Sequence, residues 1–107
     1  MGKKGDKETP ASAAATEALV ERLNSFAGVS TKKMFGGHGI FHEKKMFGLI
    51  DAKGRTFFKV TDDNRADYEK ANSEQHSRMP YFSVPDDVLA TGKDLEAWAA
   101  KAIAASK

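Results

Sequence analysis

The chain has 107 residues and a net charge of +2, with 40% hydrophobic and 30% charged residues. This length predicts one domain, and the composition is typical of a soluble globular protein rather than a disordered chain. There is no cysteine, which excludes disulfides, thiolate metal sites and cysteine nucleophiles. No apolar run approaches the roughly 18 residues of a membrane span, and no signal-peptide pattern is present. We therefore expect a cytoplasmic protein.

The first residues are polar and lack periodicity, and we expect residues 1–11 to form a flexible leader before a single domain at 12–107. From Ser12 onward the chain is rich in alanine, glutamate and leucine, and apolar residues recur at helical spacing as far as Phe26. This pattern predicts a first helix, with Gly28 as its stop.

Three short apolar runs come next, at residues 34–41, 46–50 and 55–60. The connections between them, Glu43-Lys44 and Lys53-Gly54, are too short for parallel strands, so the runs predict antiparallel hairpins.

Two details of these runs bear on the sheet. Alternation in the third run places Phe57 and Lys59 on one face, and Thr56, Phe58 and Val60 on the other. The glycines in Gly36-Gly37-His38-Gly39 predict a bulge or a close backbone approach inside a long first strand.

The remaining third alternates between helix and strand patterns. Thr61, followed by Asp62, Asp63 and Asn64, predicts the start of a helix that runs to about residue 72. Residues 73–84 predict one or two strands around 81–84, bracketed by two prolines. Thr91 and Asp94 resemble a capping box, and the apolar residues behind them have the spacing of an amphipathic helix: Leu95, Trp98, Ala99, Ala102 and Ile103.

The elements together predict a two-layer α+β domain. Helices pack on an antiparallel β-sheet of about five strands, in the order α-β-β-β-α-β-β-α.

Five segments in order resemble the N-terminal domain of the TfoX (Sxy) competence regulators of bacteria. The sequence MFGGHGIF at 34–41 is similar to the signature opening of that domain, and MFGLI at 46–50 follows at the family's spacing. FFKV at 57–60 and the charged stretch at 62–65 resemble its third strand and second helix, and MPYFSVPD at 79–86 resembles its late strand and short turn. The resemblance covers about residues 17 to 104.

The resemblance carries expectations about fold and function. It implies an antiparallel sheet with helices, similar to secretion-chaperone-like folds. Full-length relatives also carry a C-terminal domain. Because the present sequence resembles only their N-terminal domain, we expect a stand-alone N-terminal domain. They are positive regulators of competence genes that act together with the cyclic-AMP receptor protein. This implies a non-enzymatic regulatory or adaptor domain that works through protein partners of the transcription machinery.

Nothing in the sequence predicts a catalytic site, a cofactor or a metal. The glycine run has neither of the usual phosphate-loop spacings and is followed by a strand pattern. His38 and His42 are four residues apart in a predicted strand, roughly 13 Å, which is too far to share a metal. The carboxylates stand mainly at expected helix starts. No serine has a nucleophile-elbow pattern.

Positive charge is concentrated in residues 28–60, where seven basic residues stand against two acidic ones, whereas residues 61–107 carry a net charge of −3. Basic residues interleaved with phenylalanines on neighbouring strands suit a surface that binds nucleic acid. Two alternatives stay open: direct DNA binding, and a protein-partner surface that needs no DNA contact. The candidate residues for either surface are Lys32, Lys33, Lys44, Lys45, Arg55 and Lys59.

Overall fold

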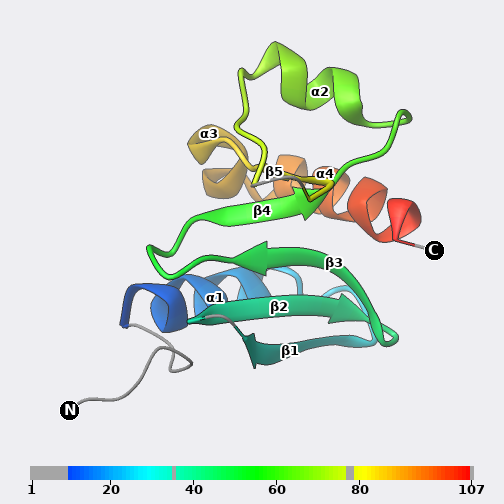
Figure 1. Ribbon diagram of the computed structural model, residues 1–107. Helices are drawn as coiled ribbons and strands as arrows, with labels where there is room; N and C mark the ends of the chain where they lie inside the picture. The colour runs from blue at the N-terminus through cyan, green and yellow to red at the C-terminus, as the bar shows by residue number, and fades with distance from the viewer. Residues whose placement is uncertain (1–9, 35, 77–78, 107) are drawn as a thin grey trace.

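The computed structural model describes residues 10–34, 36–76 and 79–106. Of the expected leader, residues 1–9 lie outside this part of the chain, and Pro10 and Ala11 already belong to the first helix. The elements in chain order are α1 (Pro10–Arg22), β1 (Val29–Met34), β2 (Gly37–His42), β3 (Lys45–Ile50), β4 (Thr56–Lys59), α2 (Arg65–Lys70), β5 (Tyr81–Ser83), α3 (Asp86–Ala90) and α4 (Gly92–Ala105) (Figure 1).

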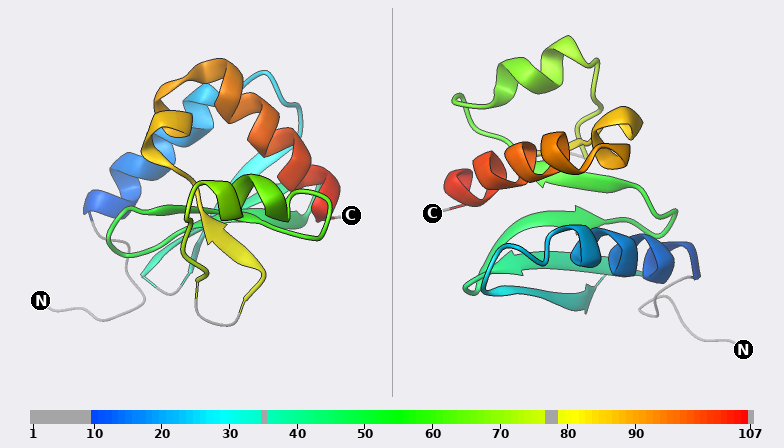
Figure 2. Two further views of the ribbon diagram at one scale, coloured as in Figure 1. Left: turned by 90° about the horizontal axis from the view of Figure 1, so that it is seen from above. Right: turned by 180° about the vertical axis from the view of Figure 1, so that it is seen from behind.

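The strands form one five-stranded sheet in the order β1-β2-β3-β4-β5, and every neighbouring pair is antiparallel. Helices α1, α3 and α4 lie on one side of this sheet, and α2 lies beyond β4 (Figure 2). The predicted α+β class, with helices packed on an antiparallel sheet, is confirmed. The order differs in detail, because the described residues hold four strands before α2 and one after it.

The main core fills the space between the sheet and the helices. Its largest fully buried side chains include Phe47, Phe58 and Ile40 from the strands and Leu95 from α4. The predicted amphipathic pattern of α4 is confirmed, since Leu95, Ala99, Ala102 and Ile103 are buried and Trp98 packs against the core. Burial of this apolar surface is the main contribution to stability in a domain of this kind.

The glycine run leads into β2. Of the two predicted alternatives, the bulge at these glycines inside one long strand is wrong, and the close backbone approach is confirmed at Gly37. Met34 pairs with Gly37, so the chain reverses between them and residues 29–34 form a separate strand. Gly37 allows close packing, because a Cβ there would stand 2.0 Å from the carbonyl oxygen of Ile50. The register irregularity lies further along β2, at Ile40 and Phe41.

Three helix predictions need correction. Helix α1 ends at Arg22, and Gly28 instead has a positive φ of 84° and accepts a hydrogen bond from the Glu43 N–H, which places the chain beside the β2–β3 turn. Helix α2 begins at Arg65. The buried Asn64 side chain holds the preceding turn, where it accepts from Thr61 N–H at 2.7 Å and donates to the Lys59 carbonyl at 3.0 Å.

The capping box before α4 is also absent. The Thr91 hydroxyl donates to the Asp87 carbonyl at 3.0 Å and makes no capping bond. It bonds there because a short helix that the sequence pattern did not predict, α3, immediately precedes α4.

Candidate interaction surface

The two faces of the sheet have different surroundings. Helices α1 and α4 cover one face, as the view from behind shows (Figure 2, right), and we call the opposite side the open face. The open face carries a second, smaller apolar cluster, which consists of Leu49, Phe57 and Tyr81 with Met46 packed against them. The Tyr81 hydroxyl donates to the Met46 carbonyl at 3.1 Å, which ties β5 to β3, and burial raises the pKa of this phenol.

Two cationic side chains, one just before β4 and one at its end, lie over aromatic rings of this cluster. The Arg55 guanidinium stands 5.5 Å from the ring centroid of Phe57, and the Lys59 ammonium stands 5.6 Å from that of Tyr81. Both distances fall within the range of cation–π attraction. The two rings are only 1% and 4% exposed, so neither is free to stack on a nucleic-acid base.

Arg55 is also paired with acids. Its Nε donates to Asp51 Oδ2 at 2.9 Å, and its Nη1 donates to Glu74 Oε1 at 3.3 Å. Burial tends to raise the pKa of the Asp51 carboxyl, but the hydrogen bonds and positive charge of Arg55, with a further bond from the Lys53 N–H, outweigh burial and lower that pKa. The positive charge of Arg55 is therefore largely compensated.

The structure does not gather the six candidate basic residues on one surface. Strand alternation places Lys32 on the open face, whereas Lys33, paired with His38, points to the helix side. Lys44 and Lys45 lie in and just after the β2–β3 turn at one end of the sheet. Arg55 and Lys59 share the open face, but a separation of four strand residues is roughly 13 Å. The candidate set therefore divides into an open-face group (Lys32, Arg55 and Lys59), a turn group (Lys44 and Lys45), and Lys33 on the helix side.

A small pocket on the open face was not predicted from the sequence. Its lining includes Met34, Met46, Leu49 and Met79. One sequence feature points to it: KKMFG occurs at 32–36 and again at 44–48. The two copies place Met34 on β1 and Met46 on β3, on either side of Gly39 in β2.

The histidines have structural surroundings. His38 is buried, and its Nδ1 is hydrogen-bonded to the Ser12 hydroxyl of α1 at 3.0 Å. The His76 ring meets the Phe57 ring edge-on, with centroids 4.8 Å apart. Within the described residues, no three His, Cys, Asp or Glu side chains are grouped to hold a metal ion.

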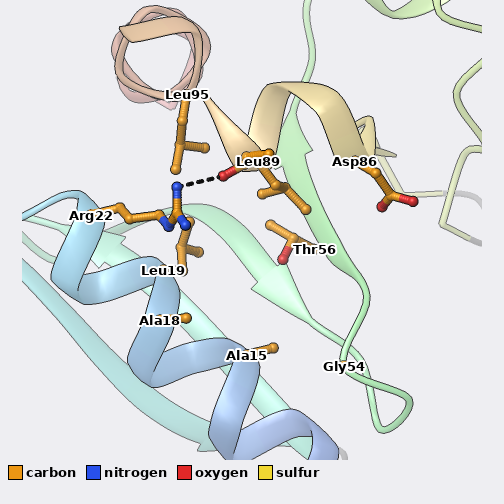
Figure 3. A pocket seen from close by; sticks show the side chains of 10 residues that line it. Ala15, Ala18, Leu19, Arg22, Gly54, Thr56, Asp86, Leu89 and Leu95 are labelled. Atoms are coloured by element: carbon orange, nitrogen blue, oxygen red, sulfur yellow. Dashed lines mark hydrogen bonds between the residues drawn. The ribbon is translucent and has the colours of Figure 1, made fainter. Parts of the chain in front are cut away.

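A groove on the helix side separates α1 from α3 (Figure 3). It has a volume of about 310 Å³, and its walls include Ala15, Ala18 and Leu89. The Arg22 guanidinium crosses it and donates to the Leu89 carbonyl at 2.9 Å. Because alanine side chains are small, they do not fill the space between α1 and α3, and the hydrogen bond from Arg22 connects the two helices. The groove is a packing junction between helices.

These features define a class: a small α+β domain with helices on one face of its sheet and, among the described residues, no helix on the other, where the segment before β5 packs instead. No helix in the described part of the chain has the length and apolar character needed to cross a membrane.

The chain belongs to the TfoX N-terminal domain family, because the family model matches residues 21–106. A comparison with curated proteins gives no match. The family is not known as an enzyme family. Membership in it supports, in general terms, a domain similar to those of competence regulators.

Proposed function

We propose that this protein is a non-enzymatic regulatory adaptor that binds a protein partner of the transcription machinery. The observation that carries this proposal is the position of β1 at the edge of the sheet that the described residues form. Strand β1 has six residues, stands at one end of the sheet order, and exposes its four central residues. An edge strand with unpaired backbone groups is a template for another chain, and protein recognition commonly uses it.

The family supports the regulatory part of the proposal. Competence regulators that this domain resembles act with the cyclic-AMP receptor protein, and a domain without its own DNA-reading motif needs such a partner to reach a promoter. Transfer of this partner to the present chain is part of the proposal.

Direct electrostatic binding of DNA is the second candidate. The excess of basic residues between 28 and 60 favours it. The division of those residues between two ends and two faces of the sheet weakens it, as does the burial of the Phe57 and Tyr81 rings. A protein partner needs only part of this basic surface.

Salt dependence distinguishes the two candidates. Labelled duplex DNA is titrated with the protein at low and near-physiological salt, and purified cyclic-AMP receptor protein is titrated in parallel. Wild type is compared with a Lys32/Lys33/Lys44/Lys45→Glu variant. The adaptor proposal predicts receptor binding that depends on salt much less steeply than DNA binding does, because fewer counterions are released.

Tight DNA binding that falls steeply with salt and disappears in the variant, without receptor binding, would overturn the adaptor proposal. Circular dichroism of the variant checks that the four exposed substitutions leave the fold intact.

A further inference from the structure

Three methionines converge at the open-face pocket, which has a volume of about 70 Å³. Met34 comes from β1, Met46 from β3, and Met79 from the segment before β5. This volume is a little over twice that of a water molecule in the liquid. It is far below the roughly 300 Å³ of a small-molecule site, so it suits a single apolar side chain.

Gly39 makes room for the methionine tips. A Cβ on Gly39 would stand 3.0 Å from Met34 Cε and 3.0 Å from Met46 Sδ. Both side chains therefore reach over the same point of β2. Methionine is flexible and polarisable, and surfaces rich in it adapt to incoming apolar groups. Met79 is 36% exposed, and it is the one exposed large hydrophobic side chain within the described residues.

His76 adds a polar group to the pocket lining. Its Nδ1 is buried and has no hydrogen-bond partner among the residues that the structure describes. A buried polar atom without a partner is costly to the fold. The pocket lining thus combines apolar side chains with a few polar residues, His76 and Asp51 among them.

The edge strand β1 leads to this pocket. Lys32 and Met34 are two residues apart on β1 and share the open face. A strand added to this edge would place one side chain opposite Lys32 and another opposite Met34, which lines the pocket. An acidic residue fits the first position by charge, and an apolar residue fits the second.

We propose that the β1 edge and the methionine pocket together bind an extended acidic segment of a partner protein. The segment adds to the sheet as a sixth strand, places a carboxylate against Lys32, and inserts one apolar side chain among Met34, Met46 and Met79. This inference rests on the proposed adaptor function and names the surface and the chemistry of its partner.

The probe is a labelled synthetic peptide that alternates glutamate with leucine and is long enough to span β1. Fluorescence anisotropy measures its binding to wild type, to Lys32→Glu and to Met79→Ser. Both substituted side chains are exposed, so the fold should be retained. The matched control is Lys93→Glu, an equal charge change on an exposed residue of α4. We expect each surface variant to weaken binding about tenfold and the control to bind like wild type.

A second peptide, with lysine in place of glutamate, tests the charge pairing. It should bind Lys32→Glu better than wild type, which a merely structural effect of the substitution would not produce. Amide NMR shifts should concentrate in residues 30–34. The proposal would be overturned if the acidic peptide bound wild type and Lys32→Glu equally, or if the NMR shifts were confined to the helices. It would also be overturned if duplex DNA displaced the peptide and the acidic peptide bound wild type no more tightly than the basic one.

The two proposals fail separately. If the cyclic-AMP receptor protein binds Lys32→Glu and Met79→Ser as tightly as wild type, the adaptor function stands and this surface is wrong.

Discussion

At the scale of single residues, Asp51 organises the turn between β3 and β4 through one carboxylate. Its Oδ1 accepts hydrogen bonds from the N–H groups of Lys53 at 3.0 Å and Arg55 at 2.8 Å, and its Oδ2 accepts the Arg55 Nε at 2.9 Å. Burial acts in the opposite direction, but the hydrogen bonds and the charge of Arg55 prevail, so the pKa lies below the usual 3.8.

The Asp51→Asn variant should therefore lose stability in a pH-dependent way. A carboxyl whose pKa is lower in the folded state stabilises the fold above its unfolded pKa of 3.8, and this contribution is lost as pH falls through the folded value. We expect wild type to be more stable than Asp51→Asn by about 1–2 kcal/mol at neutral pH. The difference should shrink as the pH is lowered below 3.8.

Urea unfolding of both proteins across this pH range measures the difference. Asp63→Asn, a substitution at an exposed residue, is the control and should follow wild type throughout. A difference between wild type and Asp51→Asn that stays constant with pH would show that the charge of Asp51 is not its source.

At the scale of elements, the β2–β3 hairpin has a strained turn. Glu43 and Lys44 both have positive φ, at 51° and 76°. Two positive φ values in a two-residue loop are typical of the type I′ turn, which matches the twist of the strands but favours glycine and asparagine. The sequence has neither at these positions, so part of the hairpin's stability is lost in backbone strain.

Replacement of Lys44 by glycine should stabilise the domain by about 0.5–1 kcal/mol, because glycine adopts this φ without a Cβ clash. Lys44→Ala is the matched control, since it removes the same charge but keeps the Cβ. The urea midpoints should rank Lys44→Gly above wild type and Lys44→Ala at or below it. Equal urea midpoints for the two variants would contradict our inference that the backbone is strained at this position.

What the sequence could predict at this scale depended on apolar periodicity. The apolar strands and α4 follow clear patterns, and they were predicted. Strand β1 was missed because its exposed central residues at the sheet edge show no apolar alternation. Helix α3 has only five residues, too few to establish a helical period. The turn before α2 depends on the side-chain bonds of Asn64, which no pattern of residue types predicts.

The candidate surface was predictable in its residue types and not in its geometry. The basic residues are visible in the sequence, but the faces of Lys32 and Lys33 depend on a strand that was missed. Met79 is distant in sequence from Met34, and the pocket that they share exists only because β5 folds back beside β4.

At the scale of the whole molecule, Tyr68 of α2 joins the last strand to the last helix. The centroid of its ring lies 4.6 Å from the ring centroid of Trp98 in α4 and 6.2 Å from that of Phe82 in β5. The side chain is almost completely buried, but its hydroxyl has no hydrogen-bond partner within the described part of the chain. Burial, and to a smaller extent the nearby charge of Asp67, raises the pKa of this phenol well above 10.0.

This arrangement predicts the alkaline stability of the fold. A phenol that ionises less readily when folded stabilises the protein fully below its unfolded pKa of 10.0, and the contribution is lost as pH rises above it. Tyr68→Phe keeps the ring and removes both the titration and the unpaired hydroxyl. At neutral pH we expect it to match wild type or exceed it by up to about 1 kcal/mol. Above pH 10.0 its advantage should grow.

Urea midpoints of both proteins at neutral and alkaline pH measure this effect. Tyr81→Phe is the matched control, because it removes the hydrogen bond to the Met46 carbonyl and should therefore be less stable than wild type already at neutral pH. If Tyr68→Phe is also clearly destabilised at neutral pH, its hydroxyl has a partner in solution. The junction of α2, β5 and α4 would then depend on a polar contact as well as on ring packing.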